Sequence, residues 1–174
     1  MSERSIQRNL KIARGLFLAY GLQVGQDRHL KELFKRYREA IHHTGEAMQR
    51  LGVTEACTRC ALEGMGSCCF AGVENNYDAV LLFINLFFGC ELTESPEIAG
   101  KCLFVGKEGC KLVARHYYCL RFFCDELRAA LGSAGVGCLN ETIGRELGLG
   151  LELEHGLRQF WRRLQRDNFL AGRS

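Results

Sequence analysis

Apolar residues in the first third of the chain recur at every third or fourth position, which is the spacing of one face of an α-helix. The first stripe consists of Ile6, Leu10, Ala13, Phe17 and Tyr20. It predicts an amphipathic helix that ends near Gly21 or Gly25. A second stripe consists of Leu30, Phe34, Tyr37, Ile41, Met48 and Leu51. We expect Asp27 to cap this second helix and Gly52 to end it. Neither stripe contains cysteine, so residues 1–52 are predicted to supply hydrophobic core.

The middle of the chain alternates strongly apolar stretches with glycine-rich ones. An apolar run over 79–90 predicts a buried helix at 77–88, capped by Asn75 or Asn76, and this run is shorter than the roughly 20 residues that span a bilayer. Glycines and Pro96 over 89–109 predict a loop or a small hairpin. Residues 111–131 then regain helical patterning.

The last part of the chain is also helical in pattern. GSAGVG at 132–137 predicts a flexible break, and two helices follow within 138–170, divided by Gly148 and Gly150. Their apolar positions are Leu139, Ile143 and Leu147, then Leu157, Trp161 and Leu164. The predicted fold is therefore mainly α: a single compact helical domain over 1–174, with an irregular cysteine-rich metal-binding segment at 57–124.

Composition and charge indicate the partners, the compartment and the use of the cysteines that we expect for this domain. The chain has 174 residues, 47% of them hydrophobic, a formal charge of +3 and ten cysteines. This charge is too small to indicate a nucleic-acid partner. The amino terminus alternates charged and apolar residues, unlike an export signal, so we expect a cytoplasmic protein without a membrane span. Stable disulfides are rare in that reducing compartment, and the cysteine excess therefore favours metal binding.

Eight cysteines fall into two groups with spacing that suits metal ligation. They are Cys57, Cys60, Cys68 and Cys69, followed by Cys102, Cys110, Cys119 and Cys124. Four thiolates can hold one zinc ion or anchor one iron–sulfur cluster, so eight could serve two centres or one centre with additional thiols. A tight turn within the C-x2-C step would let two thiolates converge.

Two pairs within these groups are not expected to bind in the same way. The side chains of the adjacent Cys68 and Cys69 should diverge. Cys119 and Cys124 would differ in direction by about 140° on a continuous helix, so one of them should lie past a helix end or serve another centre. Cations among the cysteines, such as Lys101 and Arg115, would lower thiol pKa values and tune a bound metal.

The segment CLFVGKEGCKLVARHYYCLRFFC, from Cys102 to Cys124, together with the upstream C-x2-C…C-C group, resembles the YkgJ-like family. Proteins of this family are also described as CxxCxxCC proteins or zinc- or iron-chelating domains. The resemblance covers about 57–124 and implies that all eight cysteines are metal ligands. A related cysteine cluster in flagellin lysine methylases holds iron–sulfur.

Three functional classes follow from these observations. The first is a metal-binding protein whose eight-cysteine motif holds an iron–sulfur cluster for electron transfer or redox or metal sensing, with an unknown protein or redox partner. The second is a zinc-stapled structural or interaction protein without catalytic activity. The third is an enzyme, either a cluster-dependent redox protein or a dithiol oxidoreductase that uses Cys57 and Cys60. Phosphate-loop and dinucleotide motifs are lacking, and no catalytic residue stands out.

Residues outside the eight-cysteine pattern are given simpler roles. Cys90 and Cys138 are interpreted as small buried hydrophobic side chains. His116, three residues before Cys119, is a candidate ligand or a hydrogen-bond donor to sulfur. His42 and His43 are interpreted as surface residues of the second helix.

Overall fold

The amino-terminal helices form where the apolar stripes predict them. The computed structural model describes residues 5–63 and 67–171, so positions 1–4, 64–66 and 172–174 of the predicted domain lie outside the described residues. Helix α1 spans Ser5–Gln26 and helix α2 spans Arg28–Arg50. Asp27 caps α2 by accepting a hydrogen bond of 2.9 Å from the Leu30 N–H. Gly52, with a φ of +72°, follows the end of α2, which confirms both predicted boundaries.

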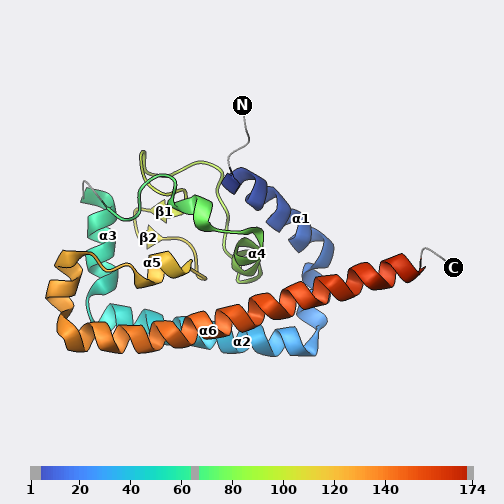
Figure 1. Cartoon of the computed structure of the whole chain (residues 1–174). Helices are drawn as coiled ribbons and strands as arrows, with labels where there is room; N and C mark the ends of the chain where they lie inside the picture. The colour runs from blue at the N-terminus through green and yellow to red at the C-terminus, as the bar shows by residue number, and fades with distance from the viewer. Residues whose placement is uncertain (1–4, 64–66, 172–174) are drawn as a thin grey trace.

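Helix α6, Asp125–Ala171, lies antiparallel along α2 and forms the base of the molecule (Figure 1). Its only non-helical residue in the described backbone is Gly132, with φ of 62° and ψ of 179°, which separates a short first part from the long remainder. The predicted break over 132–137 is therefore wrong in extent but contains the residue where the helix kinks.

Gly148 and Gly150 do not divide α6, contrary to the prediction. A Cβ at Gly150 would lie 3.2 Å from the Tyr37 ring, and a Cβ at Gly156 would lie 3.0 Å from Leu33. These glycines therefore permit close approach of α2 and α6. The contact explains why α6 continues through residues that weaken a helix interior by roughly 0.5–1 kcal/mol relative to alanine.

Helix α4, Ala79–Phe87, is the buried helix predicted from the apolar run. The expected cap at Asn75 or Asn76 is wrong, because those residues belong to the 3-10 helix η1, Val73–Asn76, and Asp78 caps α4 instead. Asp78 also forms an ion pair with Arg158 of α6 at 2.7 Å. Phe83 within α4 has no exposed surface, which places this helix at the centre of the core.

The cysteine-rich segment contributes helix α3 (Val53–Glu63), strands β1 (Val105–Gly106) and β2 (Gly109–Cys110), and helix α5 (Tyr117–Arg121). The two strands form the predicted small hairpin, with Val105 opposite Cys110. Helical structure returns only in part over 111–131, as α5 and the first residues of α6. The N–H groups of Val113 and Ala114 donate to the Asn85 side chain, both at 3.0 Å, so these amides are not available to an α-helical hydrogen-bond pattern.

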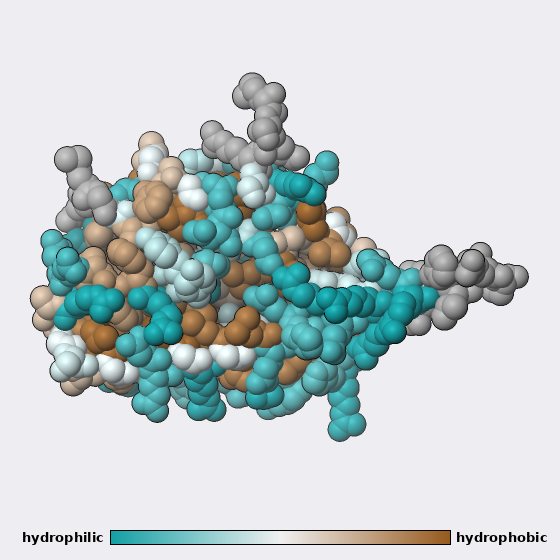
Figure 2. All heavy atoms as spheres, in the orientation of Figure 1, coloured by the Kyte–Doolittle hydropathy of each residue, from teal (hydrophilic) through white to brown (hydrophobic). Residues whose placement is uncertain are grey.

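The described part of the chain confirms a mainly α-helical single domain with a tiny sheet. Figure 2 shows hydrophilic side chains along its lower edge and along α6 up to the grey projection, and hydrophobic side chains nearer the centre and left. No described helix is both long and apolar enough to cross a membrane. The main core lies around α4, and a second apolar cluster joins α2, α5 and α6 beside the cysteines.

Candidate metal centre

A cavity of about 610 Å³ gathers cysteines from both sequence groups. The cysteines that line it are Cys57, Cys68, Cys69, Cys102, Cys110 and Cys119. Cys60 and Cys124 do not line the cavity, but both are close enough to Cys57 for their charge to raise the pKa of that thiol. The fold thus brings together six of the eight predicted ligands and keeps the other two nearby.

Helix α3 carries the C-x2-C step. Cys57 and Cys60 are three residues apart on this helix, so the expected tight turn is wrong. Residues three apart on an α-helix are neighbours on its surface, which keeps both thiols on the same side of α3. The Cys57 and Cys60 thiols are therefore brought close together by a helix and not by the predicted turn.

A backbone connection joins the two cysteine groups directly. The N–H of Cys102 donates to the carbonyl of Cys69 at 2.9 Å. Beside it, Phe70 and Lys101 form an antiparallel bridge, and the N–H of Ala71 donates to Gly100 at 3.1 Å. Residues about thirty positions apart therefore have a fixed register, and Cys69 and Cys102 are held side by side.

The hairpin places Cys110 against α3. A Cβ added at Gly109, whose φ is +103°, would lie 3.0 Å from the Thr58 hydroxyl oxygen, so the hairpin tip approaches α3 closely at this glycine. Cys57 of α3 and Cys110 of β2 also line the same cavity. The hairpin and α3 therefore both form part of the lining of the cavity.

Helix α5 holds Cys119, and Cys124 lies past its end. This arrangement agrees with the expectation that both could not serve one centre from a continuous helix. The buried Tyr77 hydroxyl donates to Cys119 Sγ at 3.7 Å and accepts from the His116 N–H at 3.1 Å. His116 Nδ1 accepts from the Tyr118 N–H at 3.3 Å and so caps α5, a role that the sequence interpretation missed.

The spacing of the sulfur atoms bears on the kind of metal that fits. Tetrahedral zinc with Zn–S bonds of about 2.3 Å brings its thiolates to about 3.8 Å from one another. Among the described residues, no three cysteine sulfurs lie within 4.8 Å of one another. The thiols are thus more widely spaced than around a closed zinc site. A cluster interposes several atoms between its cysteine ligands, so its ligand sulfurs lie farther apart than those of a closed zinc site.

Burial makes most of these thiols hard to ionise without a compensating positive charge. It raises the pKa of Cys57 to about 11, with the charges of Cys68 and Cys60 adding to the rise. Burial also raises the pKa of Cys102 to about 12. The half-buried Arg115 opposes the rise at Cys57, so it is a cation directed at the thiols, as expected from the sequence.

The adjacent pair Cys68 and Cys69 behaves differently. A hydrogen bond from the Cys69 thiol lowers the pKa of Cys68 to about 7, and the charge of Lys101 acts in the same direction. The pKa of Cys69 is raised because its thiol is the donor in this pair. Cys68 is consequently the thiol most ready to bind a metal as a thiolate.

A buried carboxyl behind Arg115 was missed from the sequence. Glu146 is 1% exposed, and neither of its carboxylate oxygens has a hydrogen-bond partner among the described residues. Burial raises its pKa, while Thr44 and the Arg115 charge oppose that rise. Its burial could have been predicted from its position three residues after Ile143, on the apolar face of a predicted helix.

The two cysteines outside the pattern do not behave alike. Cys90 is half-buried, and its thiol lies 3.5 Å from the Asn85 side-chain oxygen. Cys138 is exposed on α6, so its predicted burial is wrong. Neither residue lines the cysteine cavity.

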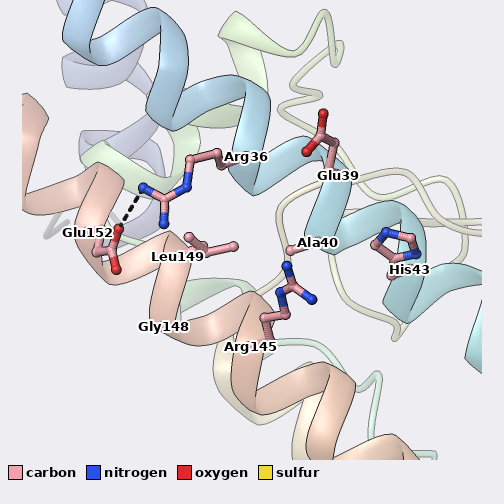
Figure 3. Close-up of a pocket in the computed structure, with 8 residues that line it drawn as sticks. All are labelled: Arg36, Glu39, Ala40, His43, Arg145, Gly148, Leu149 and Glu152. Carbon is pink, nitrogen blue, oxygen red and sulfur yellow. Dashed lines mark ion pairs between the residues drawn. The ribbon is translucent and has the colours of Figure 1, made fainter.

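A second, smaller hollow of about 320 Å³ lies between α2 and α6 (Figure 3). Arg36 and Glu152 face each other across it in an ion pair of 3.3 Å. Its lining contains no cysteine, so this groove is separate from the candidate metal centre.

Comparisons of the chain with protein-family models, curated proteins and solved structures give no match.

Proposed function

We propose that this protein binds an iron–sulfur cluster through the cysteines around the large cavity and serves in electron transfer or in redox or metal sensing. The observation that carries the proposal is the meeting of six cysteines, from both groups of the YkgJ-like pattern, at one cavity. A cluster would supply a centre that gains and loses electrons. Its ligands would be drawn from the lining cysteines, with Cys60 and Cys124 available for a second centre or as nearby thiols.

The surroundings of the cavity support this proposal. Arg115 and Lys101 supply positive charge toward thiols that become anionic when they bind metal. Apolar side chains such as Phe104 and Leu120 also line the cavity and limit its contact with water. Charge and solvent exposure both tune the reduction potential of a cluster. The proposal includes a reducing compartment such as the cytoplasm and a protein redox partner.

The dithiol oxidoreductase is a weaker alternative for the same cysteines. Attacking thiols in such enzymes usually have lowered pKa values, because the thiolate is the nucleophile. The pKa of Cys57 is instead raised to about 11, chiefly by desolvation, although the residue is exposed at the surface. The helical C-x2-C step is therefore better suited to ligation than to disulfide exchange.

Anaerobic purification followed by metal analysis, acid-labile sulfide analysis and a visible spectrum tests the proposal. We expect iron with a comparable amount of sulfide and a broad visible absorption band. Zinc without sulfide would support the structural alternative and overturn the cluster. Protein without either metal would contradict both.

A matched pair of cysteine variants locates the centre. Cys102→Ser removes a buried thiol of the cavity, whereas Cys138→Ser removes an exposed thiol outside it. We expect the first variant to lose at least about half of its iron and sulfide and the second to keep both, because four protein ligands normally hold one cluster. Circular dichroism of both variants checks that the fold is retained. Equal cluster content in the two variants would show that Cys102 is not a required ligand.

A further inference from the structure

Three exposed side chains on α2 converge outside the set of cysteines. His42 Nδ1 lies 3.6 Å from Glu46 Oε2, and His43 Nδ1 lies 3.5 Å from the same oxygen. One ligand atom from each residue lies within 4.8 Å of the other two. His42 and His43 are surface residues, as predicted from the sequence, but the sequence interpretation overlooked Glu46 as a third member.

The helix explains how these side chains meet. Glu46 follows His42 by four residues and His43 by three, and both separations make neighbours on an α-helix. The backbone beneath them is held by Thr44 and Ala47, which are buried against the rest of the domain. A rigid helix thus presents two imidazoles and a carboxylate at one place on its surface.

The cluster lies on a ridge between the two hollows of the molecule. His42 and Glu46 line the cysteine cavity, whereas His43 lines the smaller groove between α2 and α6. Figure 3 shows His43 at one end of that groove. The groove also contains two arginines and two glutamates, whose formal charges balance and so do not repel a cation from His43.

We propose that His42, His43 and Glu46 bind one divalent transition-metal ion at the mouth of the cysteine cavity. Two imidazole nitrogens and one carboxylate oxygen form a ligand set that proteins use for zinc and for non-haem iron with open coordination positions. The side chains are 71%, 64% and 54% exposed, so an ion can reach them without movement of the core. Nitrogen and oxygen ligands distinguish this site from the thiolates, and the site does not depend on the proposed cluster.

Cobalt(II) is the probe that separates the two kinds of site in the full chain. Thiolate-bound cobalt has intense charge-transfer absorption, whereas cobalt bound by nitrogen and oxygen has only weak visible bands. Titration of the anaerobic protein is combined with NMR detection of the histidine ring protons, which a nearby paramagnetic ion broadens. We expect cobalt to broaden His42 and His43, and this broadening should occur whether or not other cobalt ions produce thiolate charge-transfer absorption.

Surface variants provide the decisive comparison. Loss of an outer-shell partner alone weakens metal binding by about 10–100-fold, so removal of a ligand in Glu46→Gln should weaken this binding by at least about tenfold. His29→Ala changes another exposed histidine of α2 and serves as the matched control, with unchanged affinity. Equal affinity of wild type and Glu46→Gln, or cobalt uptake seen only through thiolate absorption, would overturn the proposed site. The iron and sulfide content measured on the same protein reports separately on the cluster.

Discussion

At the scale of single residues, polar side chains inside the apolar interior organise the candidate centre. Tyr77 links Cys119 to the backbone of His116 through its buried hydroxyl. Asn85 binds the backbone of the segment that leads to Arg115. Each uses most of its hydrogen-bonding capacity, as buried polar groups generally do. Glu146 is an exception, as are Thr44 and Trp161, because its carboxylate oxygens have no hydrogen-bond partner in the described structure.

Glu146 should make stability depend on pH. Burial raises its folded-state pKa above that of an unfolded carboxyl, so the folded protein binds this proton more tightly. Ionisation of Glu146 therefore costs no stability at acid pH, where the carboxyl is protonated in both the folded and the unfolded protein. Stability falls as pH rises from the ordinary carboxyl range of about 4 to 5 up to the raised pKa, and then levels. Tyr37, Thr44 and Arg115 are the polar groups that face Glu146.

Glu146→Gln should remove this contribution. The amide cannot ionise, so it avoids the cost of a buried charge and should raise the free energy of unfolding at neutral pH by about 1–3 kcal/mol. Urea unfolding at several pH values measures the difference. Glu141→Gln, at an exposed position of the same helix, is the control and should have little effect. A constant difference between Glu146→Gln and wild type from pH 4 to 8 would contradict the assignment.

At the scale of elements, glycine has two different structural roles in this chain. Gly52 and Gly132 have positive φ angles and lie at an end or a kink of a helix. Gly150 and Gly156 have helical geometry and lie where α2 approaches α6. A glycine pattern predicts the first use readily, because chain termination is local. The second use depends on a partner helix about a hundred residues away, and Gly150 was accordingly misread as a break.

Alanine substitutions in α6 distinguish a glycine at the contact with α2 from a glycine that has no close neighbour. Gly156→Ala places a Cβ 3.0 Å from Leu33 and should destabilise the protein by about 1–3 kcal/mol through overpacking. Gly148→Ala meets nothing within 4 Å and should stabilise the helix by roughly 0.5–1 kcal/mol. Denaturant unfolding of both variants measures the signs. Stabilisation by Gly156→Ala would show that the helices are not in close contact there.

At the scale of the whole molecule, Asn85 joins the helical core to the cysteine-rich segment. Its side-chain oxygen accepts from Val113 and Ala114, and its amide donates to the Ala114 carbonyl at 2.8 Å. The segment held in this way runs from Cys110 toward Cys119. The core thus fixes part of the cavity wall through one fully buried side chain.

Asn85→Leu should therefore affect both stability and metal content. The substitution keeps the branched heavy-atom shape but leaves two backbone N–H groups without their partner, each at a cost of about 1–3 kcal/mol. We expect a lower free energy of unfolding, and less iron and sulfide per folded chain. Asn76→Leu, at an exposed position, is the control and should leave both unchanged. Normal iron and sulfide content in folded Asn85→Leu protein would show that the cavity does not need this connection.

The features that depend on nearby residues could be predicted from the amino-acid sequence. They are the stripes of α1 and α2, the cap of α2, the buried run of α4, the hairpin and the division of the cysteines into two groups. Tertiary structure alone decided which thiols meet, why 111–131 is not one helix and why α6 continues through its glycines. Those outcomes arise from contacts between distant segments, such as Cys69 with Cys102, Asn85 with Ala114 and Tyr37 with Gly150. Local periodicity contains no record of such pairings, because they form only when the chain has folded.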